Sequence, residues 1–136
     1  MADPDIEGRC RCGGYRFRAA AGPFRVSYCH CADCRRSTGA PVVVLLGFAD
    51  EDVEILSGEA GTYRSSPGVE RLFCPACGTP IAYRDAALPG ETYYYLGLFA
   101  DPARFPPRVH AFVSEQLPWL DIRDGLPRHH RFSRER

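Results

Sequence analysis

Residues 73–80 read F-C-P-A-C-G-T-P, and this short stretch indicates how the chain is held together. A C-x-x-C-G turn presents both sulfurs on the same side of a tight loop. Gly78 permits the positive φ that such turns often need. We therefore expect Cys74 and Cys77 to supply half of a four-sulfur metal site.

The second half of this site lies near the start of the chain, where Cys10 and Cys12 form C-R-C. In an extended strand, residues two apart share a face, so both sulfurs can grip one ion. Structural zinc takes four tetrahedral ligands, and the two pairs together supply four. The sequence thus predicts one structural zinc that ties together segments more than sixty residues apart.

A third cluster, C-H-C-A-D-C, contributes Cys29, Cys31 and Cys34, which complete the count of seven cysteines. Catalytic zinc sites keep three protein ligands and one exchangeable position, so this triplet predicts a second, open site and two Zn²⁺ ions per chain. The alternative is a second closed site, completed by one of several residues: His30, Asp33, His110 or the His129–His130 pair. Alternation along the predicted strand turns His30 to the face opposite Cys29 and Cys31. The C-terminal histidines lie in a stretch that we expect to fray. Both points count against these residues as the fourth ligand.

The charge of the triplet indicates its chemistry. Three thiolates around a divalent ion leave a net charge of about −1, so the site acidifies water less than one built from imidazoles. The chain also lacks the H-E-x-x-H pattern of metallopeptidases. A soft, thiolate-rich zinc suits an incoming thiol or a small carbonyl. The predicted catalytic residues are therefore Cys29, Cys31 and Cys34, acting through bound zinc.

The rest of the sequence predicts an all-β fold with few short helical turns. Short runs of β-branched and aromatic residues alternate with Gly, Pro, Asp and Ser. The expected strands are 15–18, 25–31, 42–47, 52–56, 61–65, 70–73, 80–84, 92–99 and 109–113, and helical turns are expected within 31–39 and 101–105. No linker divides the chain, so residues 1–136 are expected to form one domain, with a core at about 8–130 and a basic tail at 128–136.

Composition excludes several classes of partner. Lys plus Arg equal Asp plus Glu at 17 each, which argues against binding to nucleic acid or an anionic membrane. The first ten residues carry acids and no apolar run, so we expect no secretory signal. Seven cysteines in a reducing compartment indicate metal binding rather than disulfides, and the expected location is the cytoplasm.

Four motifs in this order resemble the family of glutathione-dependent formaldehyde-activating enzymes, which includes centromere protein V. The motifs are G-R-C-R-C-G-G-Y-R-F, Y-C-H-C-A-D-C-R-R-S-T-G-A, F-C-P-A-C-G-T-P and P-W-L-D-I-R-D-G-L-P, and the resemblance covers residues 8–130. It implies a small antiparallel β-tent, a structural zinc on the two outer cysteine pairs and a labile, catalytic zinc on the triplet. The implied activity is that of an S-(hydroxymethyl)glutathione synthase, a carbon–sulfur lyase reaction written in reverse, with a small thiol such as glutathione as substrate.

Two further hypotheses concern recognition. Arg35 and Arg36 follow the last ligand directly and are candidates to meet the carboxylates of a glutathione-like substrate, although a solvated turn is the simpler interpretation. The alternative to an enzyme is a zinc-stabilised, non-catalytic binding module, with Phe99, Phe105 and Trp119 as candidate partner contacts or, more simply, core residues.

Overall fold

The computed structural model describes residues 6–134, so the predictions for the first five residues and for the end of the tail lie outside its described part. The described residues form ten strands, one α-helix and four single 3₁₀ turns. The strands are β1 (Ile6–Arg9), β2 (Arg16–Ala19), β3 (Arg25–Cys29), β4 (Val43–Ala49), β5 (Val53–Ser57), β6 (Gly61–Ser66), β7 (Val69–Phe73), β8 (Pro80–Asp85), β9 (Glu91–Tyr95) and β10 (Val109–Ala111). The predicted all-β architecture is confirmed.

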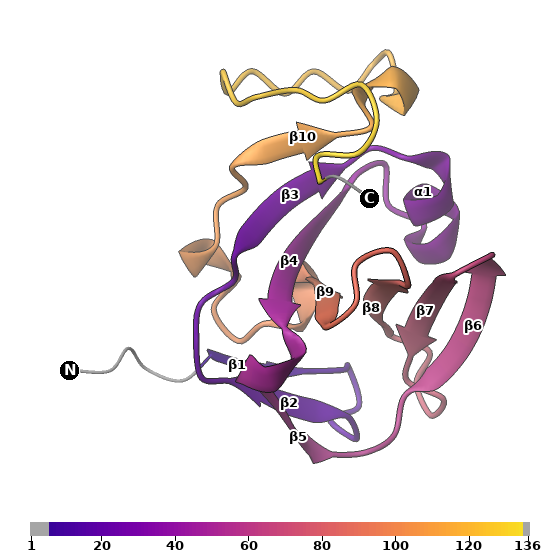
Figure 1. Ribbon diagram of the computed structural model, residues 1–136, viewed down its shortest axis with the longest axis vertical. Helices are drawn as coiled ribbons and strands as arrows, with labels where there is room; N and C mark the ends of the chain where they lie inside the picture. The colour runs from indigo at the N-terminus through magenta and orange to yellow at the C-terminus, as the bar shows by residue number, and fades with distance from the viewer. Residues whose placement is uncertain (1–5, 135–136) are drawn as a thin grey trace.

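The strands form two sheets (Figure 1). The smaller sheet has the order β1-β2-β5, and the larger has the order β10-β3-β4-β9-β8-β7-β6. Neighbouring strands are antiparallel except β10, which runs parallel to β3. This parallel pair departs from the purely antiparallel expectation. It places Ala111 opposite Cys29, and so brings the C-terminal part of the chain beside the triplet.

The core lies between the two sheets and is rich in aromatic rings. Phe17 on β2 and Phe48 on β4 are fully buried. The Phe17 ring stacks on Tyr94 of β9 with centroids 4.6 Å apart and meets Phe99 edge-on at 5.5 Å. Burial of such large apolar side chains is the main favourable contribution to folding.

Helix α1 (Ala32–Thr38) has sequence-encoded ends. Cys31 is extended at the N-cap, and its sulfur accepts a hydrogen bond from the Cys34 N–H at 3.2 Å. Gly39 ends the helix with φ +80°, the left-handed conformation that glycine adopts without strain. The helix is therefore fixed at one end by a cysteine of the triplet.

Several local predictions differ from the structure, including the predicted strands 25–31 and 109–113, which end at Cys29 and Ala111. Strand β1 was not predicted, because I-E-G-R is short and half polar. The predicted strand 92–99 ends at Tyr95 and continues as a 3₁₀ turn at Leu96–Leu98, although the strand residues are buried on both faces as expected. The tail does not fray over its described length: the Phe112 N–H donates to the Arg131 carbonyl at 2.7 Å.

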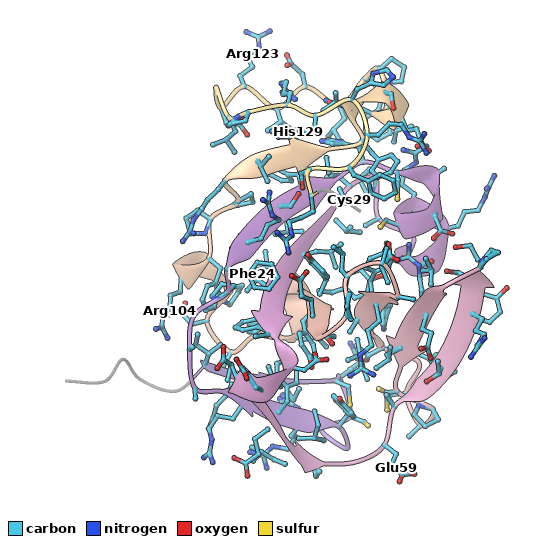
Figure 2. The ribbon with its side chains drawn as sticks, viewed as in Figure 1. Phe24, Cys29, Glu59, Arg104, Arg123 and His129 are labelled. Carbon is cyan, nitrogen blue, oxygen red and sulfur yellow. The ribbon has the colours of Figure 1, made fainter. Side chains whose placement is uncertain are left out.

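Figure 2 shows the side chains on the ribbon. Glu59 and Arg123 project outward from the edges of the molecule, whereas Cys29 is 8% exposed and lies inside it. Within residues 6–134, none of the helices has the length and apolar character needed to span a membrane.

Candidate metal centres and the adjoining cavity

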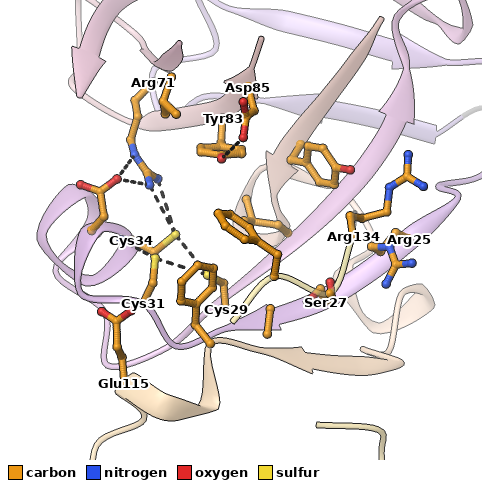
Figure 3. A pocket seen from close by; sticks show the side chains of 18 of the residues that line it. Arg25, Ser27, Cys29, Cys31, Cys34, Arg71, Tyr83, Asp85, Glu115 and Arg134 are labelled. Atoms are coloured by element: carbon orange, nitrogen blue, oxygen red, sulfur yellow. Dashed lines mark hydrogen bonds and ion pairs between the residues drawn. The ribbon is translucent and has the colours of Figure 1, made fainter. Parts of the chain in front are cut away.

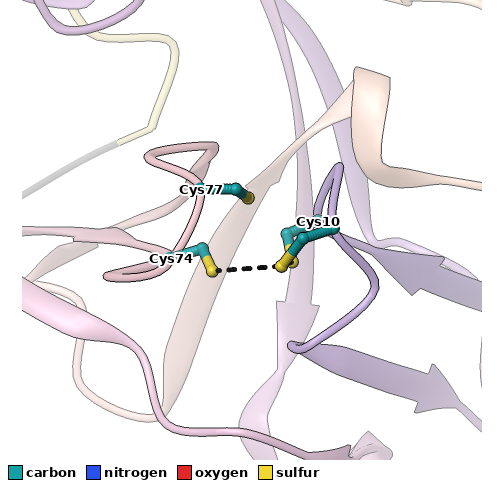
Figure 4. Close-up of side chains that lie close together, drawn as sticks. Cys10, Cys74 and Cys77 are labelled. Atoms are coloured by element: carbon teal, nitrogen blue, oxygen red, sulfur yellow. Dashed lines mark hydrogen bonds between the residues drawn. The ribbon is translucent and has the colours of Figure 1, made fainter.

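Two loops bring together the first predicted ligand set (Figure 4). Cys10 and Cys12 lie between β1 and β2, and Cys74 and Cys77 lie between β7 and β8. Their four sulfurs lie within 4.8 Å of one another. The Cys10 and Cys12 sulfurs lie 3.5 Å apart, and the Cys12 and Cys74 sulfurs lie 3.9 Å apart. The chain therefore brings the two distant pairs together as their spacing predicted.

Backbone geometry supports this arrangement. Gly78 has φ +78°, and its N–H donates to the Cys74 carbonyl at 2.7 Å, which closes the C-x-x-C-G turn. The opposite loop turns at Gly13, also at φ +78°. The Tyr15 N–H donates to the Cys10 sulfur at 3.3 Å, so a negative charge on this sulfur is stabilised by the backbone.

The second set, Cys29, Cys31 and Cys34, joins the end of β3 to the start of α1. Its sulfurs also lie within 4.8 Å of one another, with Cys29 3.5 Å from both other sulfurs. All seven cysteines are free thiols. Ligands 2.3 Å from a tetrahedral zinc lie roughly 3.8 Å apart, so the sulfurs of both sets fit such an ion.

Close packing perturbs the titration of the triplet. Hydrogen bonds from Cys29 and Cys34 lower the pKa of the Cys31 thiol, because they stabilise its thiolate. The pKa of Cys29 is raised by its hydrogen bonds with Cys31 and Cys34 and by burial, because further ionisation would put like charges in contact. The thiolate of Cys31 therefore forms more readily than that of Cys29, and a bound cation would stabilise further ionisation of the set.

Arg71 of β7 supplies a positive charge beside the triplet (Figure 3). The side chain is 8% exposed, and both Nη atoms lie 3.6 Å from the Cys34 sulfur. Nη2 also donates to the Asp33 carboxylate at 2.5 Å, and Nη1 donates to the Tyr95 hydroxyl at 2.7 Å. Burial raises the pKa of Tyr95 to about 12, so this hydroxyl stays neutral. Arg71 thus offsets part of the negative charge that the thiolates carry.

The described residues offer the triplet no fourth protein ligand. The group of atoms within 4.8 Å of one another contains the three sulfurs and no histidine or carboxylate. Among the candidates for closing the site, Asp33 pairs with Arg71. His30 faces His110, with Nε2 and Nδ1 2.9 Å apart. The geometry therefore favours the open site over the closed alternative.

A buried chain of hydrogen bonds holds the segment between the first two cysteines of the triplet. The Asp124 carboxylate lies 2.8 Å from His110 Nε2, and His110 Nδ1 faces His30 Nε2. A carboxylate only accepts, so His110 donates to Asp124 and accepts from His30. Burial, together with electrostatic repulsion from His110, Arg128 and Arg35, lowers the pKa of His30 to about 4, which keeps it neutral. Asp124 belongs to the P-W-L-D-I-R-D-G-L-P motif, so the motif anchors the segment that carries the triplet.

A cavity of about 260 Å³ opens beside the triplet. All three sulfurs line it, and apolar side chains form much of its remaining wall: Leu45, Val69, Tyr83, Tyr93, Phe112 and Phe132. Arg25, Arg71 and Arg134 contribute positive charge to the lining. Phe132, Ser133 and Arg134 of the tail line the cavity, whereas residues 128–131 are exposed. The described end of the tail is therefore part of the cavity wall.

The two candidate substrate arginines do not line the cavity, which agrees with the simpler interpretation given above. Arg35 braces the fold, because Nη1 donates to the His30 carbonyl and, at 2.6 Å, to the Glu115 carbonyl. Arg36 is exposed and absent from the cavity lining. The arginines that do line the cavity lie on β3, on β7 and in the tail. For Arg25, the sequence signal was its position four residues before Cys29 on the same predicted strand, whereas Arg134 in the tail had no such signal.

Two of the three candidate partner contacts are core residues. Phe99 and Phe105 are 4% and 7% exposed and belong to the core, which agrees with the simpler interpretation. Trp119 is 70% exposed and does not pack on the core. These three aromatic residues therefore do not form one surface.

The fold and the two cysteine sets define a small β protein with two sites suited to metal ions, one closed and one open to a cavity. Residues 5–115 match the family described as glutathione-dependent formaldehyde-activating enzyme. The chain belongs to this family, and the resemblance noted in the sequence is confirmed. It is accordingly a member of an enzyme family.

Individual relatives agree with this family assignment. A protein of Halomonas elongata named "Putative glutathione-dependent formaldehyde-activating enzyme" is 29% identical over 127 residues, which cover 86% of this chain and 80% of the relative. A protein of Schizosaccharomyces pombe named as an uncharacterized lyase is 30% identical over 93 residues, covering 68% of this chain and 66% of the relative.

The fold also occurs in a solved structure. A crystal structure of a Rhodobacter sphaeroides protein, determined by a structural genomics project, aligns with a TM-score of 0.52 at 19% identity. The alignment covers 90% of this chain and 98% of that protein. At this identity the likeness concerns the fold alone.

Proposed function

We propose that the protein is a zinc-dependent carbon–sulfur lyase that forms or cleaves the adduct of a small thiol and an aldehyde, with glutathione and formaldehyde as the reference pair. One observation carries the proposal: three mutually close sulfurs, with no fourth ligand from the described residues, line a cavity. Membership of the family supports the choice of reaction.

The proposed ligands follow the two sets. Cys10, Cys12, Cys74 and Cys77 hold the structural ion, and Cys29, Cys31 and Cys34 hold the catalytic one, giving two zinc ions per chain. Zinc in the triplet supplies a soft Lewis acid with an exchangeable position that suits a thiol or a carbonyl oxygen.

The chain's own residues prepare the reaction around this position. Arg71 donates toward the Cys34 sulfur and limits the negative charge that a second anion, the substrate thiolate, has to approach. Tyr93, Phe112 and Phe132 supply an apolar wall that displaces water from the reacting groups. The carboxylates of the lining already accept hydrogen bonds: Asp33 from Arg71, Asp85 from the Tyr83 hydroxyl and Glu115 from the Ala32 N–H.

The overall chemistry balances without a redox partner. The thiol loses its proton to solvent, and its sulfur attacks the carbonyl carbon to form the C–S bond. The π electrons of the carbonyl move to oxygen, which takes a proton from water. The reverse sequence cleaves the adduct and is the lyase direction.

The proposal extends to organisation and location. The four ligands of the closed site come from two distant segments, residues 10–12 and residues 74–77. Because one site joins these segments, we propose a single domain over residues 1–136. Seven free thiols support a reducing compartment, the cytoplasm.

The test measures exchange between glutathione and ¹³C-formaldehyde by NMR with zinc-loaded protein. With wild-type protein, we expect the adduct to form faster than in buffer. With Cys31→Ser protein that retains its structural zinc, we expect the adduct to form at the buffer rate. An uncatalysed rate with wild-type protein, together with an unchanged spectrum of the Co²⁺-substituted triplet on adding glutathione, would favour the zinc-stabilised binding module instead.

A further inference from the structure

The cavity has two chemically different ends, and strand β3 connects them. Arg25, Ser27 and Cys29 all line the cavity, because alternate residues of a strand share one face. Cys29 stands at the sulfur end. Arg25 lies four residues away along the strand, a backbone distance of about 13 Å at 3.3 Å per residue. Figure 3 shows Arg25 and Arg134 across the cavity from the three cysteines.

Arg25 differs from the other arginines of the lining. Arg71 is held by Asp33 and Tyr95, and Arg134 by Glu91. Among the described residues, Arg25 has no carboxylate partner, and this distinguishes it from Arg71 and Arg134. Its Nε is also buried and has no hydrogen-bond acceptor. A buried donor without an acceptor destabilises the protein, and more so when the donor is charged. An anion that enters the cavity removes this cost.

A carboxylate fits this position best. A guanidinium presents paired N–H donors in a plane, which match the two oxygens of a carboxylate. The apolar side chains between the two ends suit the carbon skeleton of a ligand. An extended tripeptide spans about 10 Å, comparable to the separation along β3.

We propose that Arg25 binds a carboxylate of the thiol substrate while the sulfur of that substrate lies at the Cys29, Cys31 and Cys34 end. This assignment rests on the proposed function for the orientation of the ligand. It makes the substrate a thiol that carries a carboxylate several bonds from its sulfur, and it makes Arg25 the residue that distinguishes such a thiol from a neutral one.

The experiment measures equilibrium binding to zinc-loaded protein by calorimetry, without formaldehyde. The probes are glutathione and its diethyl ester, which keeps the thiol and lacks both free carboxylates. The variants are Arg25→Met, which keeps the length and apolar stem of the side chain, and Arg25→Lys, which keeps the charge but loses the paired donors. Arg36→Met is the matched control, because Arg36 is exposed and outside the cavity lining. Cooperative thermal unfolding establishes that each variant is folded.

We expect Arg25→Met to weaken glutathione binding by roughly 10- to 100-fold, the usual range for a hydrogen bond to a charged group. Diester binding should change by less than about twofold, Arg25→Lys should fall between, and Arg36→Met should match wild type. Equal weakening of both ligands, an unchanged affinity for glutathione in Arg25→Met, or no binding of glutathione to wild-type protein would overturn the assignment. Glutathione binding that depends on Arg25 without any acceleration of adduct formation would overturn the proposed function and leave the Arg25 assignment standing.

Discussion

Replacing Arg71 by Met separates the electrostatic role of this residue from its packing role. The side chain is 8% exposed, so Met fills most of its space while the charge is removed. The Tyr95 hydroxyl, which is buried, then loses a donor at 2.7 Å, and the Cys34 sulfur loses two contacts at 3.6 Å. The ion pair with Asp33 counts for less, because that carboxylate is 53% exposed.

These losses act on two different quantities. Leaving the Tyr95 hydroxyl short of a partner costs about 1–3 kcal/mol of unfolding free energy, and the partly exposed ion pair adds at most about 1 kcal/mol. Loss of charge-assisted donors to Cys34 costs about 1.5–3 kcal/mol when the sulfur is a thiolate, which weakens zinc binding at the triplet by roughly 10- to 150-fold.

The assays are urea unfolding and zinc competition against a chromophoric chelator, with Tyr95→Phe as the control that removes the hydroxyl alone. Arg71→Met should release one zinc per chain more readily while the other stays bound, and Tyr95→Phe should leave both affinities near wild type. The reasoning is refuted by a triplet affinity within about threefold of wild type, or by equal weakening of both sites.

Three further predictions concern the framework. Phe17→Ala should lower the unfolding free energy by about 3–5 kcal/mol in denaturant titration, because Phe17 is fully buried; Tyr63→Ala, at a side chain that is 64% exposed, should stay within about 1 kcal/mol. Gly58→Ala should destabilise the protein by more than Gly90→Ala in thermal unfolding: both glycines have positive φ, but only at Gly58 would the new Cβ lie 2.4 Å from a backbone oxygen. The pKa of Tyr95 is raised to about 12 from 10, so its stabilising contribution is full below pH 10 and lost as the pH rises toward 12. Wild-type protein should therefore lose about 2–3 kcal/mol more than Tyr95→Phe between pH 10 and 12, and parallel pH profiles would contradict this.

Local chemistry made the cysteine sets predictable. Spacing within C-P-A-C-G places both sulfurs on one side of a loop, and the number of zinc ligands then divides seven thiols into four and three. Cys10 and Cys12 were expected on an extended strand, but they lie in the turn after β1, where their sulfurs are still 3.5 Å apart. The structure brings each set together as expected. The roles of the two sets as structural and catalytic ligands stay a prediction.

Pairing between distant strands could not be predicted in the same way. Arg71 lies 37 positions from Cys34 and reaches it only because β7 passes near α1. The parallel pairing of β10 with β3 depends on the path of the whole C-terminal segment, so its role in walling the cavity has no local signal. The predicted strand 25–31 places Arg25 on the same face as Cys29. Strand alternation does not show that this face borders a cavity.

Zinc content measured by atomic emission on purified, folded protein tests the central claim most directly. The account predicts two zinc ions per chain in wild type and one in Cys31→Ser, with cooperative unfolding retained in that variant. It also predicts that Cys74→Ser fails to give folded protein, because the closed site ties two segments of the fold together. A wild-type chain with one zinc or none, or an equal collapse of both variants, would contradict the division into a structural and a labile site.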